Sequence, residues 1–156
     1  MNKLPEAIAQ FQRAMKIDPG FVDARHNLAQ TLILAGRHAQ AVRVVEPLRD
    51  GDATACFFLA QAHVQLGDLT AAEVAINQAV TLRPSFAPAQ NLRGLILANL
   101  GEETDAIAAY EAALALDPNN VETLVNISLP LARQNRHAEG HEMVERAVQL
   151  APEHIG

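Results

Sequence analysis

A proline recurs along this chain at a fixed spacing, and this spacing restricts the possible fold more than any other feature. Pro84, Pro118 and Pro152 are each 34 residues apart, and Pro19 closes an earlier segment. A period of this length is typical of repeat proteins, in which every repeat is one small supersecondary unit. With the prolines as markers, the segments align into units that begin at Val22, Ala53, Ala87 and Val121.

Every unit has the same internal pattern. Its apolar residues follow helical spacing in two stretches of about twelve to fourteen residues, which are too long for strands. The two stretches are separated by residue types that readily take the left-handed conformation at a helix end, namely Gly36, Gly67, Gly101 and Asn135. Small residues recur at the eighth place (Ala29, Ala60, Gly94, Ser128) and the twentieth (Ala41, Ala72, Ala106, Gly140). The pattern predicts antiparallel helical hairpins whose two helices cross closely at the small residues.

A single hairpin of this kind cannot cover its own apolar face, so consecutive hairpins are expected to stack on one another. The predicted fold is therefore all-α, a right-handed superhelical solenoid of about nine helices with a concave side.

The residues at the repeated places resemble those of the tetratricopeptide repeat (TPR) family. The segment 87–120 matches the family pattern best, through Gly94, Gly101, Ala106, Tyr110, Ala113 and Pro118. The resemblance covers essentially the whole chain and implies a single TPR domain over residues 1–156. Its predicted parts are a partial repeat with only a second helix (1–21), a shortened repeat (22–52) and three further repeats (53–86, 87–120 and 121–154).

Three features depart from the family pattern. The unit 22–52 has only 31 residues, and its second helix contains Pro47, so we expect that helix to kink or to end early. Pro130 is expected to bend the first helix of the last unit. The chain starts in mid-unit and ends where another unit would begin, so we expect a piece of a longer protein with apolar end faces that can stack chain to chain.

Composition excludes several kinds of function. The formal net charge is −6 and the 12 basic residues are spread along the chain, which argues against a nucleic-acid partner. No apolar run is long enough for a signal peptide or a membrane span, so we expect no membrane insertion and a cytoplasmic protein. Ala is abundant, and ten Arg stand against two Lys, which favours a bacterial origin.

The sequence offers little chemistry for catalysis. Cys56 is at a place where the family has a packed residue, so an inert thiol is expected. His137 and His141 are four residues apart on an expected helix, but no third ligand is assured, so we predict no metal site and no cofactor. No phosphate-binding loop or serine elbow is present, and we expect no catalytic residues and no enzyme activity.

In the TPR family the first helix of each unit lines a concave groove, and the resemblance carries the groove positions over by register. The residues that it implies for peptide binding are Asp23, His26, Asn27, Gln30, Phe57, Gln61, Gln65, Asn91, Leu95, Asn99, Glu122, Asn126 and Arg133. Amides among apolar side chains suit an extended peptide. The groove has no Lys and only one Arg, which argues against the carboxylate clamp of TPR co-chaperones. Asn27 and Asn126 have an alternative role, in which they brace neighbouring helices instead of contacting a ligand.

Two functions remain open from the sequence. In the first, the chain is a protein-protein interaction scaffold that binds a peptide or helix of a partner in its groove. In the second, it is the targeting or substrate-presenting arm of a larger bacterial enzyme, such as a glycosyltransferase, sulfotransferase or hydroxylase.

Overall fold

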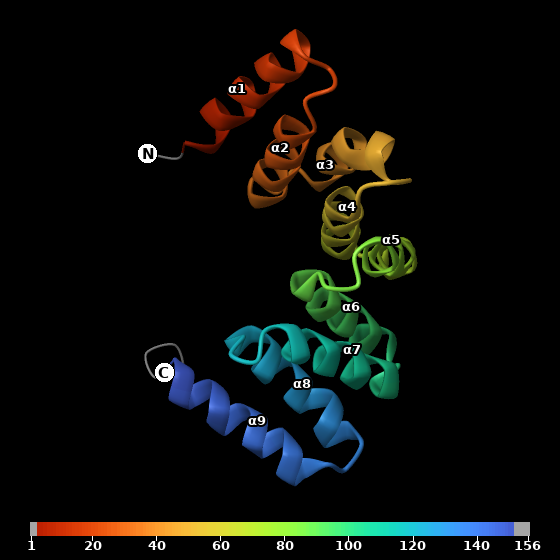
Figure 1. The fold of residues 1–156 in the computed structure, drawn as a ribbon, viewed down its shortest axis with the longest axis vertical. Coiled ribbons are helices and arrows are strands. Elements are labelled where there is room, and N and C mark those ends of the chain that lie inside the picture. The colour runs from red at the N-terminus through yellow and green to blue at the C-terminus, as the bar shows by residue number, and fades with distance from the viewer. Residues whose placement is uncertain (1–2, 152–156) are drawn as a thin grey trace. The chain divides into compact units, whose positions relative to one another are not determined.

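The computed structural model describes residues 3–151 of the 156-residue chain. Within this range the backbone forms nine α-helices and one 3-10 helix, and no strand (Figure 1). The helices are α1 (Leu4–Ile17), α2 (Val22–Leu34), α3 (His38–Val45), α4 (Ala53–Leu66), α5 (Leu69–Leu82), α6 (Ala87–Leu100), α7 (Glu103–Leu116), α8 (Val121–Arg133) and α9 (His137–Leu150), with the 3-10 helix η1 (Glu46–Leu48) after α3. The predicted all-α class and the number of helices are confirmed.

The chain forms two compact units, residues 1–82 (unit 1) and residues 83–156 (unit 2). Unit 1 holds α1 to α5, and unit 2 holds α6 to α9. The division into individual repeats, and their union into one domain, stay predictions.

In unit 1 each helix packs against the next, and α2 also packs against α4. Branched and aliphatic side chains fill the spaces between the helices, because the repeat pattern places them on the faces that meet. These buried side chains include Leu28, Leu32, Val45, Leu59 and Ile76. The crossings of the two hairpins have alanine at 0% exposure on both sides, at Ala29, Ala41, Ala60 and Ala72.

In unit 2 the same order holds, with α6 on α7, α7 on α8, α8 on α9, and α6 beside α8. A buried cluster at the centre includes Leu97, Ile107, Tyr110, Ile127 and Leu131. The ring of Tyr110 lies directly over Gly94, where an added Cβ would come within 2.6 Å of the ring. The small residue at the eighth place is thus what admits the tyrosine between α6 and α7.

The residues between the helices of each hairpin behave as predicted. Gly36, Gly67 and Gly101 have φ of 71°, 79° and 82°, and Asn135 has φ of 61°. This left-handed geometry turns the chain within a few residues, which lets the second helix return antiparallel to the first.

The two internal prolines differ in their effects. Pro47 ends α3 as predicted, because the helix stops at Val45 and a single turn of 3-10 helix follows. Pro130 does not end α8, which continues to Arg133. Its ring is fully buried in the packed part of unit 2. The bend of α8 stays a prediction.

Cys56 is fully buried, and its thiol donates to the backbone oxygen of Arg49 at 3.0 Å. Burial raises the pKa of the thiol, which disfavours the reactive thiolate. The expected packing role therefore agrees with the surroundings of this residue. Among the described residues, no helix is both long enough and apolar enough to cross a membrane.

Candidate functional site

The predicted site residues all lie on first helices, which pair within each unit. α2 contacts α4 in unit 1, and α6 contacts α8 in unit 2. We call the surface formed by the site residues on α2 and α4 the inner face of unit 1, and the surface formed by those on α6 and α8 the inner face of unit 2.

The inner face of unit 1 is mostly polar. Its exposed members are Asp23, Asn27, Gln30 and Gln65, while His26, Phe57 and Gln61 are half-buried. Phe57 and Phe58 are adjacent and their ring centroids lie 5.7 Å apart, but only Phe58 is buried, whereas Phe57 is half-buried.

His26 takes part in the internal structure of unit 1. Its Nε2 atom lies 2.8 Å from Oδ2 of Asp52, although the alignment falls short of a well-formed hydrogen bond. The other carboxylate oxygen of Asp52 accepts from the backbone N–H groups of Thr54 and Ala55 and so caps α4. The imidazole also lies 6.0 Å from the ring of Phe58. His26 is therefore occupied by contacts between α2 and α4, which leaves less of it for a ligand.

The inner face of unit 2 is hollowed. A cleft of about 330 Å³ lies between α6 and α8, and four predicted site residues line it, namely Leu95, Asn99, Asn126 and Arg133. Val125 and Leu129, which are 42% and 55% exposed, provide further apolar surface in the same cleft. The structure thus brings together residues from two repeats that are about thirty positions apart in the sequence.

Arg133 and Glu122, the charged residues predicted on this face, both have partners within unit 2. Arg133 Nη1 lies 2.8 Å from Oε1 of Glu103, at the start of α7, and contacts the backbone oxygen of Ala98 at 3.4 Å. The Nδ2 atom of Asn91 donates to Oε1 of Glu122 at 3.2 Å. The positive charge of Arg133 is therefore largely balanced before any ligand binds.

Tyr110 lines the floor of the cleft and is 1% exposed. Burial raises the pKa of its phenol, and the carboxylates of Glu122 and Glu103 raise it further. The phenol is therefore neutral over the physiological pH range.

Asn27 and Asn126 differ from the other two asparagines of the inner faces. Within residues 3–151, the side chain of neither makes a hydrogen bond, whereas Asn91 pairs with Glu122 and Asn99 donates to the backbone oxygen of Leu95. The described part of the chain therefore gives no support to the bracing role for Asn27 and Asn126.

Six residues that line the cleft were not among the predicted site residues: Ala98, Tyr110, Val125, Ser128, Leu129 and Pro130. Tyr110 and Ser128 occupy places that the repeat pattern assigns to helix crossings. A crossing residue can also reach a cleft with one edge, and no periodic signal in the sequence distinguishes these two cases.

The histidines that might suggest a metal site are on the exposed surface of α9. His141 Nε2 lies 3.2 Å from Glu145 Oε1, and both side chains are more than half exposed. Within residues 3–151, no group of three or more potential metal ligands comes together.

Comparison with protein-family models shows to which family the chain belongs. Two family models, both described as tetratricopeptide repeat, match residues 1–54 and 57–121. The chain belongs to the tetratricopeptide repeat family. Proteins with TPR repeats generally act as non-catalytic scaffolds that bind proteins or peptides.

One curated protein is similar to this chain in sequence. The BBSome complex member BBS4 of Xenopus tropicalis is 29% identical over 126 residues, which cover 79% of this chain but only 24% of that protein. The chain thus spans about a quarter of the length of this relative.

Two solved structures share the TPR solenoid fold. TTC0263, a thermophilic TPR protein of Thermus thermophilus, is 26% identical with a TM-score of 0.82, over 98% of this chain and 86% of that chain. YrrB, described as a TPR protein with an unusual peptide-binding site, is 23% identical with a TM-score of 0.76, over 99% of this chain and 81% of that chain. The bacterial origin that the composition favours agrees with the Thermus neighbour.

Proposed function

We propose that this TPR protein is a non-catalytic scaffold that binds a peptide or helix of a partner protein on its inner faces. The observation that carries the proposal is the cleft of unit 2, in which four residues predicted from the repeat register lie together. YrrB, a TPR protein with an unusual peptide-binding site, supports the same use of the fold. We further propose that the protein acts in the cytoplasm.

The lining of the cleft favours a segment with an aliphatic side chain. Leu95, Val125 and Leu129 offer apolar contact, and burying such a side chain contributes about 1.5 to 3 kcal/mol. The amides of Asn99 and Asn126 lie at the same cleft, where they can pair with the backbone of a bound segment. Apolar contacts then supply affinity, and the amides orient the peptide.

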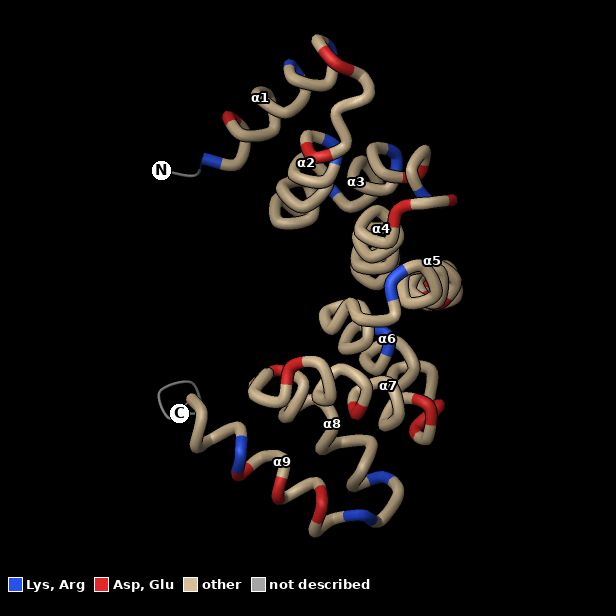
Figure 2. Tube along the Cα trace, in the orientation of Figure 1, with Lys and Arg blue, Asp and Glu red and all other residues tan. Residues whose placement is uncertain are grey.

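The charge of unit 2 argues against a strongly acidic partner. Residues 83–156 contain ten carboxylate side chains and five arginines, a formal charge of −5, whereas residues 1–82 carry a formal charge of −1. Figure 2 shows acidic residues along α7 and α9. With Arg133 balanced by Glu103, the described residues of the cleft offer no free cation to a carboxylate terminus. We expect a neutral or basic segment.

The decisive experiment selects peptides from a random 12-residue library on the wild-type protein and measures their affinities by calorimetry. Leu129→Asp places a charge in the exposed apolar part of the cleft and should weaken the selected peptides about tenfold, because a central apolar contact of an interface contributes on the order of 1 kcal/mol or more. The matched control is Val148→Asp on α9, at a side chain of 41% exposure that does not line the cleft, and it should leave the affinities unchanged. Equal binding to wild type and Leu129→Asp would refute the assignment of this cleft.

The alternative function is the arm of a larger bacterial enzyme. The small share of the BBS4 relative that the chain spans is compatible with a part of a longer protein. Reading the coding sequence beyond both ends tests this alternative, since an adjoining catalytic domain would support it and more repeats would support the scaffold. Stacking between chain ends also stays a prediction, which light scattering over a concentration series would test.

A further inference from the structure

Three corners between a second helix and the next first helix have related sequences. The first is Asp18-Pro19-Gly20-Phe21, the second is Arg83-Pro84-Ser85-Phe86 and the third is Asp117-Pro118-Asn119-Asn120. In each corner the last residue is the N-cap position of the following helix. The proline oxygen accepts a side-chain hydrogen bond in all three, from Arg25, Gln90 and Arg146 respectively. The corners are therefore built alike, and differences in their first and last residues can be compared directly.

In the second and third corners, the first and last residues interact with each other within the chain. In the second, the guanidinium carbon of Arg83 lies 4.6 Å from the ring centroid of Phe86, a cation–π contact. In the third, Nδ2 of Asn120 donates to Oδ2 of Asp117 at 3.1 Å, and Oδ1 of Asn120 accepts from the backbone N–H of Thr123. The aromatic ring of the second corner is thus covered by a cation, and the third corner has a helix-capping asparagine in place of the ring.

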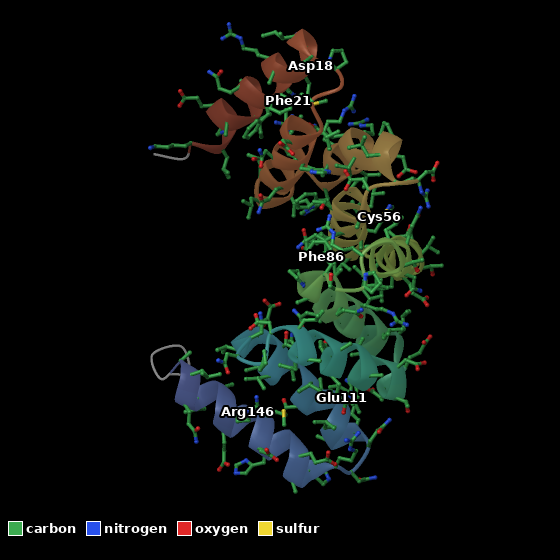
Figure 3. All side chains as sticks on the ribbon, viewed as in Figure 1. Asp18, Phe21, Cys56, Phe86, Glu111 and Arg146 are labelled. Carbon is green, nitrogen blue, oxygen red and sulfur yellow. The ribbon has the colours of Figure 1, made fainter. Side chains whose placement is uncertain are left out.

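The first corner has the aromatic ring without the cation. Phe21 is 45% exposed, and Ile17 and Val22, which flank this corner in the sequence, are 86% and 37% exposed. Asp18 stands where the second corner has Arg83, and its Oδ1 accepts from the backbone N–H of Gly20 at 2.9 Å. Within residues 3–151, no basic side chain stacks on Phe21. Figure 3 labels Asp18 and Phe21 at the turn between α1 and α2.

Arg25, which approaches this corner, is committed elsewhere. Its guanidinium donates to the backbone oxygens of Pro19 and Val44, at 3.1 Å and 3.2 Å. Arg25 therefore links this corner to α3 and does not stack on the ring of Phe21.

We infer that the corner formed by Ile17, Asp18, Phe21 and Val22, which we call the Phe21 corner, docks an arginine side chain of a partner protein. The guanidinium stacks on the ring of Phe21, as Arg83 stacks on Phe86, and pairs with the carboxylate of Asp18. Ile17 offers apolar surface to the aliphatic part of the arginine side chain, or to an apolar residue next to it in the partner segment. The planar, weakly hydrated guanidinium suits this combination of ring and carboxylate better than the ammonium of lysine.

The inference rests on the proposed function in one respect, that the ligand is a protein segment. It places a docking point at a helix corner of unit 1 that is separate from the cleft of unit 2. Loss of binding at one of the two sites therefore leaves the other testable.

The experiment titrates the full chain with the peptide acetyl-Gly-Leu-Arg-Leu-Gly-amide and follows the ring resonances of phenylalanine by NMR. The arginine peptide should move the Phe21 resonances in a saturable manner. Matched peptides with lysine or with uncharged citrulline in place of arginine should bind more weakly. Asp18→Asn should weaken the arginine peptide about two- to fivefold, as expected for one exposed ion pair. Phe21→Ala removes the stacking ring, so the backbone amide resonances of Val22 should no longer shift when the arginine peptide is added.

A gain-of-function variant checks the reasoning at the second corner. Arg83→Asp makes that corner Asp-Pro-Ser-Phe and should let Phe86 respond to the arginine peptide, whereas Phe86 in the wild-type chain should not. Asp18→Arg should close the first corner by supplying the cation within the chain. If Phe21 does not respond in the wild type, or if all three peptides give equal responses, the inference is wrong, even when the library peptides still bind the cleft of unit 2.

Discussion

The hairpin α2–α3 in unit 1 and the hairpin α6–α7 in unit 2 reach a packed crossing by different means. In α6–α7 both helices have 14 residues, and the bulky Tyr110 fits over Gly94. In α2–α3 the second helix has 8 residues before η1 begins, and Val45 occupies the place of the tyrosine with Ala29 at the crossing. A repeat can therefore have a smaller side chain at the crossing and a shorter second helix, as long as the crossing stays closely packed.

The shortened helix leaves backbone groups that its missing turn would have satisfied. The carbonyl oxygen of Arg49 accepts from Sγ of Cys56 at 3.0 Å and from Nε2 of Gln78 on α5 at 2.9 Å. Asp52 then caps α4 directly. In the shortened repeat, side-chain hydrogen bonds thus replace part of the helix, because buried backbone groups need partners.

The largest effect is expected at the crossing of α6 and α7. Gly94→Val puts branched carbons where even a Cβ would lie 2.6 Å from the ring of Tyr110, so the free energy of unfolding should fall by about 3 kcal/mol. Thermal or urea unfolding measures the change. Gly51→Val in the loop of the shortened repeat is the control, because a Cβ there meets nothing within 4 Å, and it should have little effect. A small effect of Gly94→Val would show that Tyr110 can move aside, and that the crossing is looser than the contact implies.

An intermediate effect is expected at the start of α4. Asp52→Ala removes the carboxylate that caps the helix and that contacts His26, and it should lower the free energy of unfolding by about 1 to 2 kcal/mol. Asp50→Ala, at an exposed carboxylate two residues earlier, is the matched control and should change stability by less than about 0.5 kcal/mol. Equal effects of both variants would mean that the general charge of the loop matters and the cap does not.

The smallest effect is expected at the link between α5 and the shortened repeat. Gln78→Leu deletes the hydrogen bond to the Arg49 carbonyl oxygen but leaves the bond from Cys56, so the loss should be about 1 kcal/mol. Gln149→Ala on the exposed surface of α9 is the comparison and should be neutral. Hydrogen exchange should show the loss of protection around Arg49 to Asp52 and little change in α6 and α7; uniform loss across the chain would contradict a local role.

Much of the fold was predictable because the repeat supplies the same signal several times. Small residues at the eighth and twentieth places, turn residues with positive φ, and an early end at Pro47 all follow from local chemistry, and the structure confirms them. The behaviour of Pro130 was harder to predict. Its burial depends on neighbouring helices, and no rule for an isolated helix includes them.

The candidate site was predictable only in part. Register placed Leu95, Asn99, Asn126 and Arg133 on first helices, and these residues share the cleft. It did not reveal that His26 contacts Asp52, or that Arg133 is balanced by Glu103, because those partners come from other elements. Because of these contacts within the chain, His26 and Arg133 are expected to contribute less to ligand binding.

By itself, the sequence determined the class of fold, the family and the positions of the helices, because the helical period, the turn residues and the repeat spacing are local properties that recur. Only the tertiary structure decided which polar side chains remain available to a partner. Availability depends on what neighbouring helices bring within a few ångströms: Asp52 to His26, Glu103 to Arg133, and Arg83 to Phe86 but no cation within the described residues to Phe21.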